Sequence, residues 1–179
     1  MTRRLKDPLL LVGKAIAIVM QAAMVLGAIA LIVAAVGITF FTPELAAEAD
    51  MEFFPADFPV AALVGVMLIG LAIVTMLFFF FDKLRRIIGT VGEGDPFQPA
   101  NAVRLNRMAW LMVGIQLSLL PATALGMKLA EHADEMNEAQ ITVGRGLDLE
   151  GILLAIVLFI LARVFRHGAA MRDDLEGTV

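Results

Sequence analysis

The sequence predicts an all-α protein, an integral membrane bundle of four transmembrane helices forming a single domain over residues 1–179. Three observations carry this prediction. Hydrophobic residues make up 60% of the chain, against roughly 45–50% in a soluble domain. Charged residues make up 18%, against roughly 25%. The charges also leave four long uncharged runs between them. Because a soluble fold of this size would have too little polar surface, the excess apolar surface is expected to face lipid.

The first three uncharged runs are long enough to cross a bilayer. Each reaches the roughly 20 residues that a membrane-crossing helix needs. The predicted spans are 15–41, 60–81 and 108–127. The first run is also far longer than the roughly 7–15 apolar residues of a signal peptide, so residues 1–43 are interpreted as a retained helix.

The fourth uncharged run, residues 151–162, would form only about 18 Å of helix, which is too short by itself. It can cross if Glu150 and Arg163 reach outward to the two interfaces while neighbouring apolar residues extend the span. The alternative is a half-inserted helix. A full span at 149–167 is preferred because an even number of crossings also agrees with the distribution of basic residues.

That distribution predicts the orientation. Four crossings place twelve of the fourteen Lys and Arg residues on one side of the membrane, in segments 1–14, 82–107 and 163–179. The loops 44–59 and 128–150, on the other side, are acidic. Because Lys and Arg are retained on the cytoplasmic side, both termini and the loop between the second and third spans are predicted to be cytoplasmic.

The cytoplasmic loop 82–107 is predicted to be a helical hairpin. Apolar residues at helical spacing continue the second span, namely Leu84, Ile87, Ile88 and Val91. Gly92 to Pro96 should break this helix, and Pro99 is typical of a helix start. Phe97 is expected to dock on the preceding helix, with Gly94 and Pro96 setting the reversal of the chain. The alternative is that Phe97 dips into the bilayer interface.

Small residues form two faces at helical spacing, and such faces let membrane helices approach closely. They are Ala23, Gly27, Ala30 and Ala34 in the first span, and Gly114, Ser118, Ala122 and Gly126 in the third. They predict packing contacts within the chain or between copies in a homo-oligomer; the alternative is chance in a chain rich in Ala and Gly. Gln21 and Gln116, the amides within the spans, are expected to face another helix rather than lipid.

No catalytic, cofactor or metal site is predicted, and the chain is not expected to be an enzyme. Cysteine is absent, Ser118 is the single serine, and the predicted topology puts His132 and His167 on opposite sides of the membrane, so no Ser–His pair can form within one chain. His132 lies among acidic residues that could attract a divalent cation, but a solvated outer helix is the preferred interpretation. No charged residue lies in the middle of a span, which argues against ion-coupled transport.

Two cytoplasmic stretches show a family resemblance. The segments 84–88, 94–97 and 101–105 read Leu-Arg-Arg-Ile-Ile, Gly-Asp-Pro-Phe and Asn-Ala-Val-Arg-Leu, and residues 162–168 read Ala-Arg-Val-Phe-Arg-His-Gly. This pattern resembles the bacterial membrane family called domain of unknown function 2975. The resemblance implies four helices, an inner-membrane location and a gene placed beside a small Cro-type helix-turn-helix regulator. The family has no established activity, so it implies no catalytic residue.

The preferred hypothesis is a regulatory membrane protein that holds or releases a small cytoplasmic DNA-binding regulator through loop 82–107 and the tail. The candidate interaction surface comprises Arg85, Arg86, Gly94, Pro96, Phe97, Asn101, Arg104 and Arg107. Direct nucleic-acid binding is not expected, because the loop is only weakly basic; contact with anionic lipid head groups is the simpler interpretation of its charge. The alternative function is a small oligomeric transporter or channel. Both hypotheses place the protein in the lipid bilayer and require no cofactor.

Overall fold

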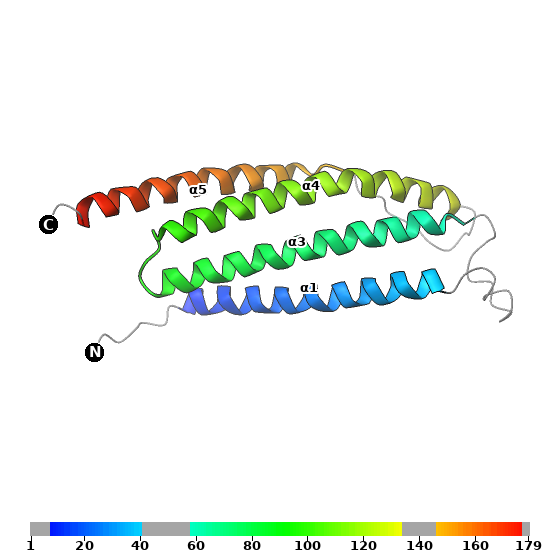
Figure 1. Ribbon diagram of the computed structural model, residues 1–179, viewed down its shortest axis with the longest axis horizontal. Coiled ribbons are helices and arrows are strands. Elements are labelled where there is room, and N and C mark those ends of the chain that lie inside the picture. The colour runs from blue at the N-terminus through cyan, green and yellow to red at the C-terminus, as the bar shows by residue number, and fades with distance from the viewer. Residues whose placement is uncertain (1–7, 41–57, 134–145, 177–179) are drawn as a thin grey trace.

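The structure is a computed structural model that describes residues 8–40, 58–133 and 146–176. These residues form four helices, α1 (Pro8–Phe40), α3 (Val60–Gly92), α4 (Pro99–Ala133) and α5 (Leu149–Glu176) (Figure 1). The predicted all-α class is therefore confirmed. By length and composition α1, α3 and α4 can each cross a membrane. The crossing by α5 and the orientation of the termini stay predictions.

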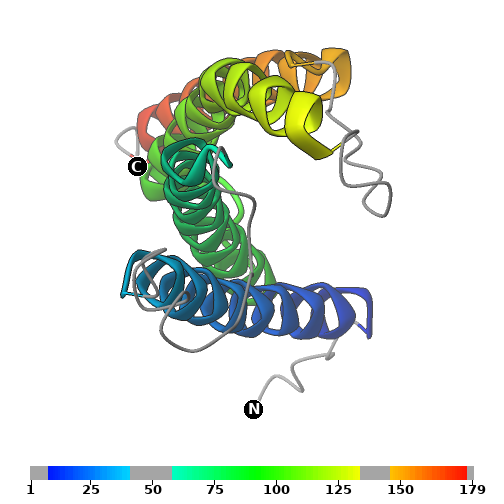
Figure 2. The ribbon, with the colours of Figure 1, turned by 90° about the vertical axis from the view of Figure 1, so that its right-hand side faces the viewer.

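The helices form an open, curved layer. Among the described residues α1 packs on α3, α3 on α4 and α4 on α5, so each helix contacts only its neighbours in chain order. Seen along the helices, α1 lies at one end of the curve and α5 near the other (Figure 2). The expected bundle is thus not closed. Because lipid solvates apolar side chains, a membrane helix can leave most of its surface uncovered; in α1 only Ala17 and Gln21 are buried.

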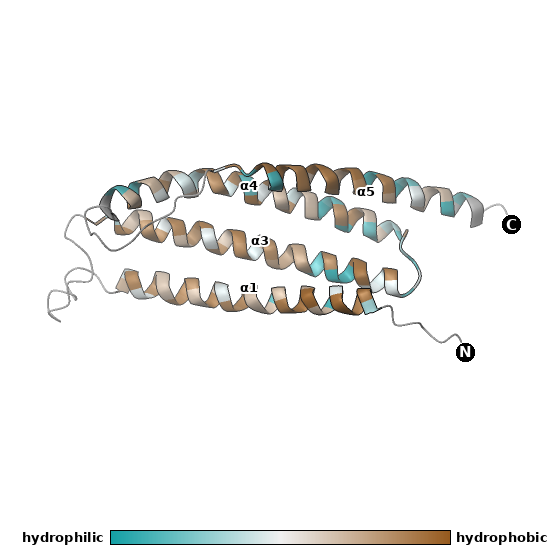
Figure 3. Ribbon diagram, turned by 180° about the vertical axis from the view of Figure 1, so that it is seen from behind, coloured by the Kyte–Doolittle hydropathy of each residue, from teal (hydrophilic) through white to brown (hydrophobic). Residues whose placement is uncertain are grey.

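Three helix ends project beyond the predicted spans at one end of the molecule. Helix α3 continues past Phe81 to Gly92, and α4 begins at Pro99, well before Met108. Helix α5 continues past the predicted end of its span to Glu176. The α3–α4 turn and the C-terminal end of α5 lie at the same end (Figure 1), and hydrophilic residues gather on α3 near that turn (Figure 3). The predicted helical hairpin is confirmed.

The core lies along α4, where this helix packs against α3 and against α5. Its buried members are Ile87, Leu105, Met108, Ala109, Met112, Ile115, Ala155, Leu158 and Ala162. The alanines, of which Ala109 is fully buried, allow α4 and α5 to approach closely. Because part of this core belongs to the projecting ends, Ile87 and Leu105 fix the hairpin to the membrane segments below it.

The small-residue face of α4 lies partly against α3. A Cβ atom at Gly114 would come within 2.9 Å of the Met76 Sδ atom, so any larger residue at that position would displace the Met76 side chain. The Ser118 hydroxyl donates a hydrogen bond to the Gly114 carbonyl at 2.8 Å and is thus satisfied within its own helix. Ala122 and Gly126 are half-buried.

The small-residue face of α1 is open in the single chain. Ala23 and Ala30 are exposed, Ala34 is half-buried, and nothing lies within 4 Å of a Cβ atom placed at Gly27. Helix α1 turns a different face to α3. There a Cβ atom at Gly13 would lie 3.4 Å from the Ile88 Cδ1 atom.

The two amides within the spans are buried, as predicted. Gln116 also fixes the start of α5, because its Oε1 atom accepts a hydrogen bond from the Asp148 backbone N–H at 2.9 Å. The Asp148 carboxylate in turn accepts hydrogen bonds from the backbone N–H groups of Glu150 and Gly151, at 3.3 and 3.2 Å. Asp148 therefore caps the helix, which satisfies backbone donors that would otherwise be unpaired.

Candidate functional site

The reversal between α3 and α4 is a glycine-dependent helix end. The Gly94 N–H donates to the Val91 carbonyl at 3.0 Å and the Asp95 N–H to the Thr90 carbonyl at 3.1 Å, the hydrogen-bond pair of a Schellman motif. This motif needs a left-handed residue, and Gly94 has a φ of +85°. The role predicted for Gly94 in reversing the chain is therefore confirmed. Glycine is favoured there because, without a Cβ atom, it adopts a positive φ at no steric cost.

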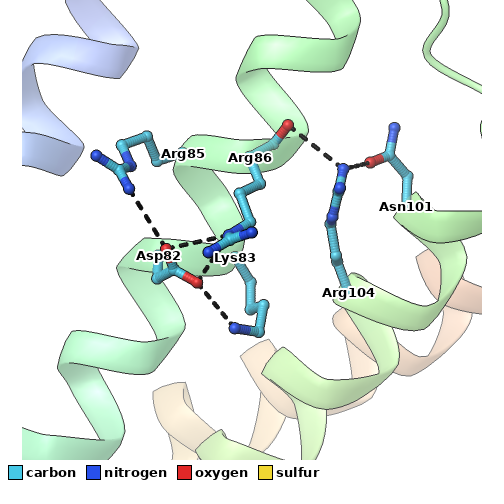
Figure 4. Close-up of polar contacts among 6 residues, drawn as sticks. All are labelled: Asp82, Lys83, Arg85, Arg86, Asn101 and Arg104. Atoms are coloured by element: carbon cyan, nitrogen blue, oxygen red, sulfur yellow. Dashed lines mark hydrogen bonds and ion pairs between the residues drawn. The ribbon is translucent and has the colours of Figure 1, made fainter.

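Asn101 ties the turn together from inside. Its side chain has no exposed surface. The Nδ2 atom donates hydrogen bonds to the Thr90 Oγ1 atom at 2.8 Å and to the Pro96 carbonyl at 2.9 Å. The Oδ1 atom accepts one from the Arg104 Nη1 atom at 2.8 Å (Figure 4). One amide thus joins the end of α3, the turn and the first turns of α4.

Asp82 organises the basic residues at the base of the hairpin. Its carboxylate lies 2.8 Å from the Lys83 Nζ atom, 3.0 Å from the Arg86 Nε atom and 3.5 Å from the Arg85 Nη2 atom (Figure 4). Burial acts to raise the pKa of Asp82, but hydrogen bonds and Coulombic attraction from Lys83 and Arg86 outweigh it and hold the pKa below its ordinary value. The carboxylate therefore stays ionised and its three cations stay oriented.

Phe97 joins the turn to α5. Its ring centroid lies 5.4 Å from that of Phe165, and a Cβ atom at Gly168 would come within 2.7 Å of its ring. Close approach of α5 thus depends on the glycine. Next to this contact, Asp95 in the turn forms an ion pair with Arg172 of α5. The predicted partner of Phe97 was the preceding helix, α3; the ring contact that the structure shows is with α5.

The candidate residues divide into two groups. Gly94, Pro96, Asn101 and Arg104 build the hairpin through the hydrogen bonds described above. Arg85, Arg86 and Arg107 present charge to the surroundings, since the side chains of Arg85 and Arg86 are 40% and 57% exposed and Arg107 is exposed as well. Phe97, 42% exposed, belongs to both groups. We call residues 82–107 together with 163–176 the platform.

Several residues that help to build the platform were not among the predicted site residues; they include Asp82, Thr90, Asp95, Phe165, Gly168 and Arg172. Asp82 could have been found from its spacing, because a carboxylate four residues before Arg86 is typical of an ion pair within one helix. Gly168 and Arg172 could not, because their partners, Phe97 and Asp95, lie far away in the sequence, in the turn between α3 and α4.

The cation site weighed for the outer acidic loop falls mostly outside the described residues, since its acidic residues at 134, 135 and 138 lie there. Within residues 8–40, 58–133 and 146–176, no three His, Asp or Glu side chains gather closely enough to hold a metal ion.

Comparison with known proteins identifies a family for this chain but no individual relative. No curated protein and no solved structure matches the chain. The sequence profile of the family described as "Protein of unknown function (DUF2975)" matches residues 2–179. The match covers almost every residue, including both stretches that carried the resemblance. The chain therefore belongs to the DUF2975 family, domain of unknown function 2975.

Proposed function

We propose that the protein lies in the bacterial inner membrane with the platform in the cytoplasm, and that it acts as the regulatory membrane partner of a small cytoplasmic helix-turn-helix regulator. While held on the platform, the regulator would be unable to bind its DNA. When released, it would bind that DNA. The observation that carries the proposal is the construction of the platform, in which side chains from the turn and from α3, α4 and α5 hold together a hairpin on which Arg86 and Arg107 stay exposed.

The internal bonding of the platform favours binding of a folded partner. A surface that is already ordered loses little conformational freedom when a partner docks, so more of the contact energy appears as affinity. The buried Asn101, the Phe97–Phe165 contact and the Asp95–Arg172 ion pair all reduce that freedom. A hairpin that served only to connect two membrane spans would not need these contacts with α5.

The charge of the platform sets the chemistry of the partner. Arg86 and Arg107 are exposed basic residues at the end of the chain's membrane segments. Such residues favour a partner with an acidic patch and steer its approach. The orientation part of the proposal is supported by the concentration of twelve of the fourteen basic residues on one side of four crossings.

The proposal is tested by purifying the tagged full-length protein from membranes and measuring how much of the regulator encoded beside it is recovered. We expect recovery from the unaltered protein. The double variant Arg86→Glu, Arg107→Glu should lose most of it, because it replaces attraction with repulsion at two exposed positions. Glu131→Lys is the control, since it changes an exposed charge at the opposite end of α4.

Equal recovery with the double variant and the Glu131→Lys variant would refute the platform as the binding surface. Failure to recover the regulator with the unaltered protein would refute the regulatory role itself. The alternative function, a small oligomeric transporter or channel, has no observation in its favour among the described residues.

A further inference from the structure

A groove of about 350 Å³ lies between α3 and α4, on the membrane side of the platform. It is lined by Met76, Phe79 and Lys83 from α3 and by Arg107, Trp110 and Leu111 from α4. Its volume is at the lower end of the roughly 300–1,000 Å³ that small-molecule sites occupy. Four of the six lining residues are apolar and the other two are cationic; none is acidic.

The lining residues follow the same order along both helices. On α3, Phe79 lies one turn and Met76 about two turns deeper than Lys83, which is about 6 and 10 Å along the axis. On α4, which runs in the opposite direction, Trp110 and Leu111 lie about one turn deeper than Arg107. Lys83 and Arg107 stand just outside the uncharged runs 60–81 and 108–127, so the cations lie at the membrane boundary and the apolar residues lie within it.

The two cations of the groove, Lys83 and Arg107, differ in whether a nearby carboxylate neutralises their charge. Lys83 is bound to Asp82 at 2.8 Å, is largely buried with a side chain 19% exposed, and lies 5.8 Å from the Phe79 ring centroid. Asp82 is shared with two arginines, so this cluster keeps an excess of positive charge. Arg107 is exposed, and within the described residues no hydrogen bond or ion pair engages it. The groove therefore offers a positive charge that none of the described residues neutralises.

We propose that this groove binds one anionic phospholipid, with its head-group phosphate between Lys83 and Arg107 and the upper part of an acyl chain against Phe79, Trp110 and Met76. The groove is cationic at the membrane boundary and apolar below it. This arrangement matches an anionic phospholipid, whose charged head group lies above its apolar acyl chains. Trp110 suits this position, because the residue is 62% exposed while its ring packs edge-on against Phe159 of α5. Tryptophan is enriched at membrane interfaces, where its ring has both an apolar and a polar part.

The single tryptophan of the chain makes the site directly measurable, because Trp110 lines the groove. The full-length protein would be reconstituted in phosphatidylcholine vesicles that contain a small, equal fraction of brominated phosphatidylglycerol or brominated phosphatidylcholine. Bromine on an acyl chain quenches tryptophan fluorescence only at short range. We expect the anionic lipid to quench Trp110 more, with a preference of about five-fold for each cation that contributes.

Arg107→Gln should lower the preference for phosphatidylglycerol about five-fold, and Lys83→Gln should lower it as well. The matched control is Arg85→Gln. Arg85 shares the Asp82 carboxylate with Lys83 but points toward α1, away from the groove (Figure 4). This control therefore removes the same charge, and a contact with the same acid, without altering the site.

Three results would overturn the proposal. The first is equal quenching of the unaltered protein by the two brominated lipids. The second is a loss of preference in Arg85→Gln as large as in Arg107→Gln, which would mean that the overall charge of the interface attracts the lipid. The third is relief of quenching by millimolar inorganic phosphate, which would show that the groove prefers free phosphate to the lipid. Unchanged quenching with phosphate supports the lipid.

Discussion

Replacing Asn101 with alanine should loosen the platform more than any other single polar substitution in the hairpin. The amide is fully buried and makes hydrogen bonds to Thr90, Pro96 and Arg104. Alanine removes all three hydrogen bonds and leaves a void in place of the amide. The two neutral hydrogen bonds are each worth about 1 kcal/mol, and the one from the arginine about 1.5–3 kcal/mol.

Part of this loss is recovered, because Arg104 can turn toward water. We therefore expect Asn101→Ala to lower the free energy of unfolding by about 3 kcal/mol. For a chain of this length such a change lowers the melting temperature by about 6–12 °C. The measurement is thermal unfolding of the detergent-solubilised protein, together with the rate of proteolysis between residues 93 and 98.

Asn106→Ala is the matched control. Asn106 stands on the same helix and carries the same amide, but it is half-buried and its side chain makes no hydrogen bond within the described residues. Its replacement should lower the melting temperature by no more than about 2 °C, since a surface substitution changes stability by about 0.5 kcal/mol or less. Equal melting temperatures and equal proteolysis rates for the two variants would refute the role given to Asn101.

Three further predictions concern other parts of the chain. Gly151→Ala should destabilise the protein in thermal unfolding by at least about 2 kcal/mol, because its Cβ atom would lie 1.6 Å from the Gln116 Nε2 atom; an unchanged melting temperature would contradict the close contact of α4 with α5. Asp82→Asn should cost about 1–3 kcal/mol at neutral pH. Because folding lowers the pKa of Asp82, that contribution is fully present above its ordinary value of 3.8 and is lost as the pH falls through the folded-state value; a difference in melting temperature that persists unchanged in more acidic solution would argue against the ion pairs. Reporter fusions after Asp50 and after Asp95 should report opposite sides of the membrane, and the same side for both would contradict the topology.

The elements that could be predicted from the sequence are those decided by local chemistry. Uncharged runs of about 20 residues located α1, α3 and α4, because a charge within the bilayer is costly. Glycine and proline marked the end of α3 at Gly92 and the start of α4 at Pro99, because each residue imposes its own backbone geometry.

The arrangement of the helices could not be predicted in the same way. Within a membrane, an apolar side chain facing lipid and one facing another helix look alike in the sequence, so the open curve of α1, α3, α4 and α5 has no signature there. Small residues are equally ambiguous. Gly114 lies against Met76, whereas Gly27, in an equally regular pattern, faces open space.

The platform was only partly predictable for a related reason. Asn101 was identified with the family pattern, but its hydrogen bond to Thr90 depends on the reversal that brings α3 and α4 together. Phe97 was expected on the apolar face of α3, because Gly94 and Pro96 reverse the chain there. Its contacts with Phe165 and Gly168 arise from the packing of α5 against α4, which the periodicity of residues 82–107 does not contain.

The central claim, that the platform holds a cytoplasmic regulator, is tested most directly by photo-crosslinking in intact cells. A photoreactive amino acid would replace Val103, which is 50% exposed near the start of α4, or Leu120, which is 48% exposed within the predicted span of the same helix. We predict that position 103 crosslinks to the regulator encoded beside the protein, identified by its mass and by antibody, while position 120 crosslinks to lipid. The same lipid products from both positions, with no regulator at position 103, would contradict the account.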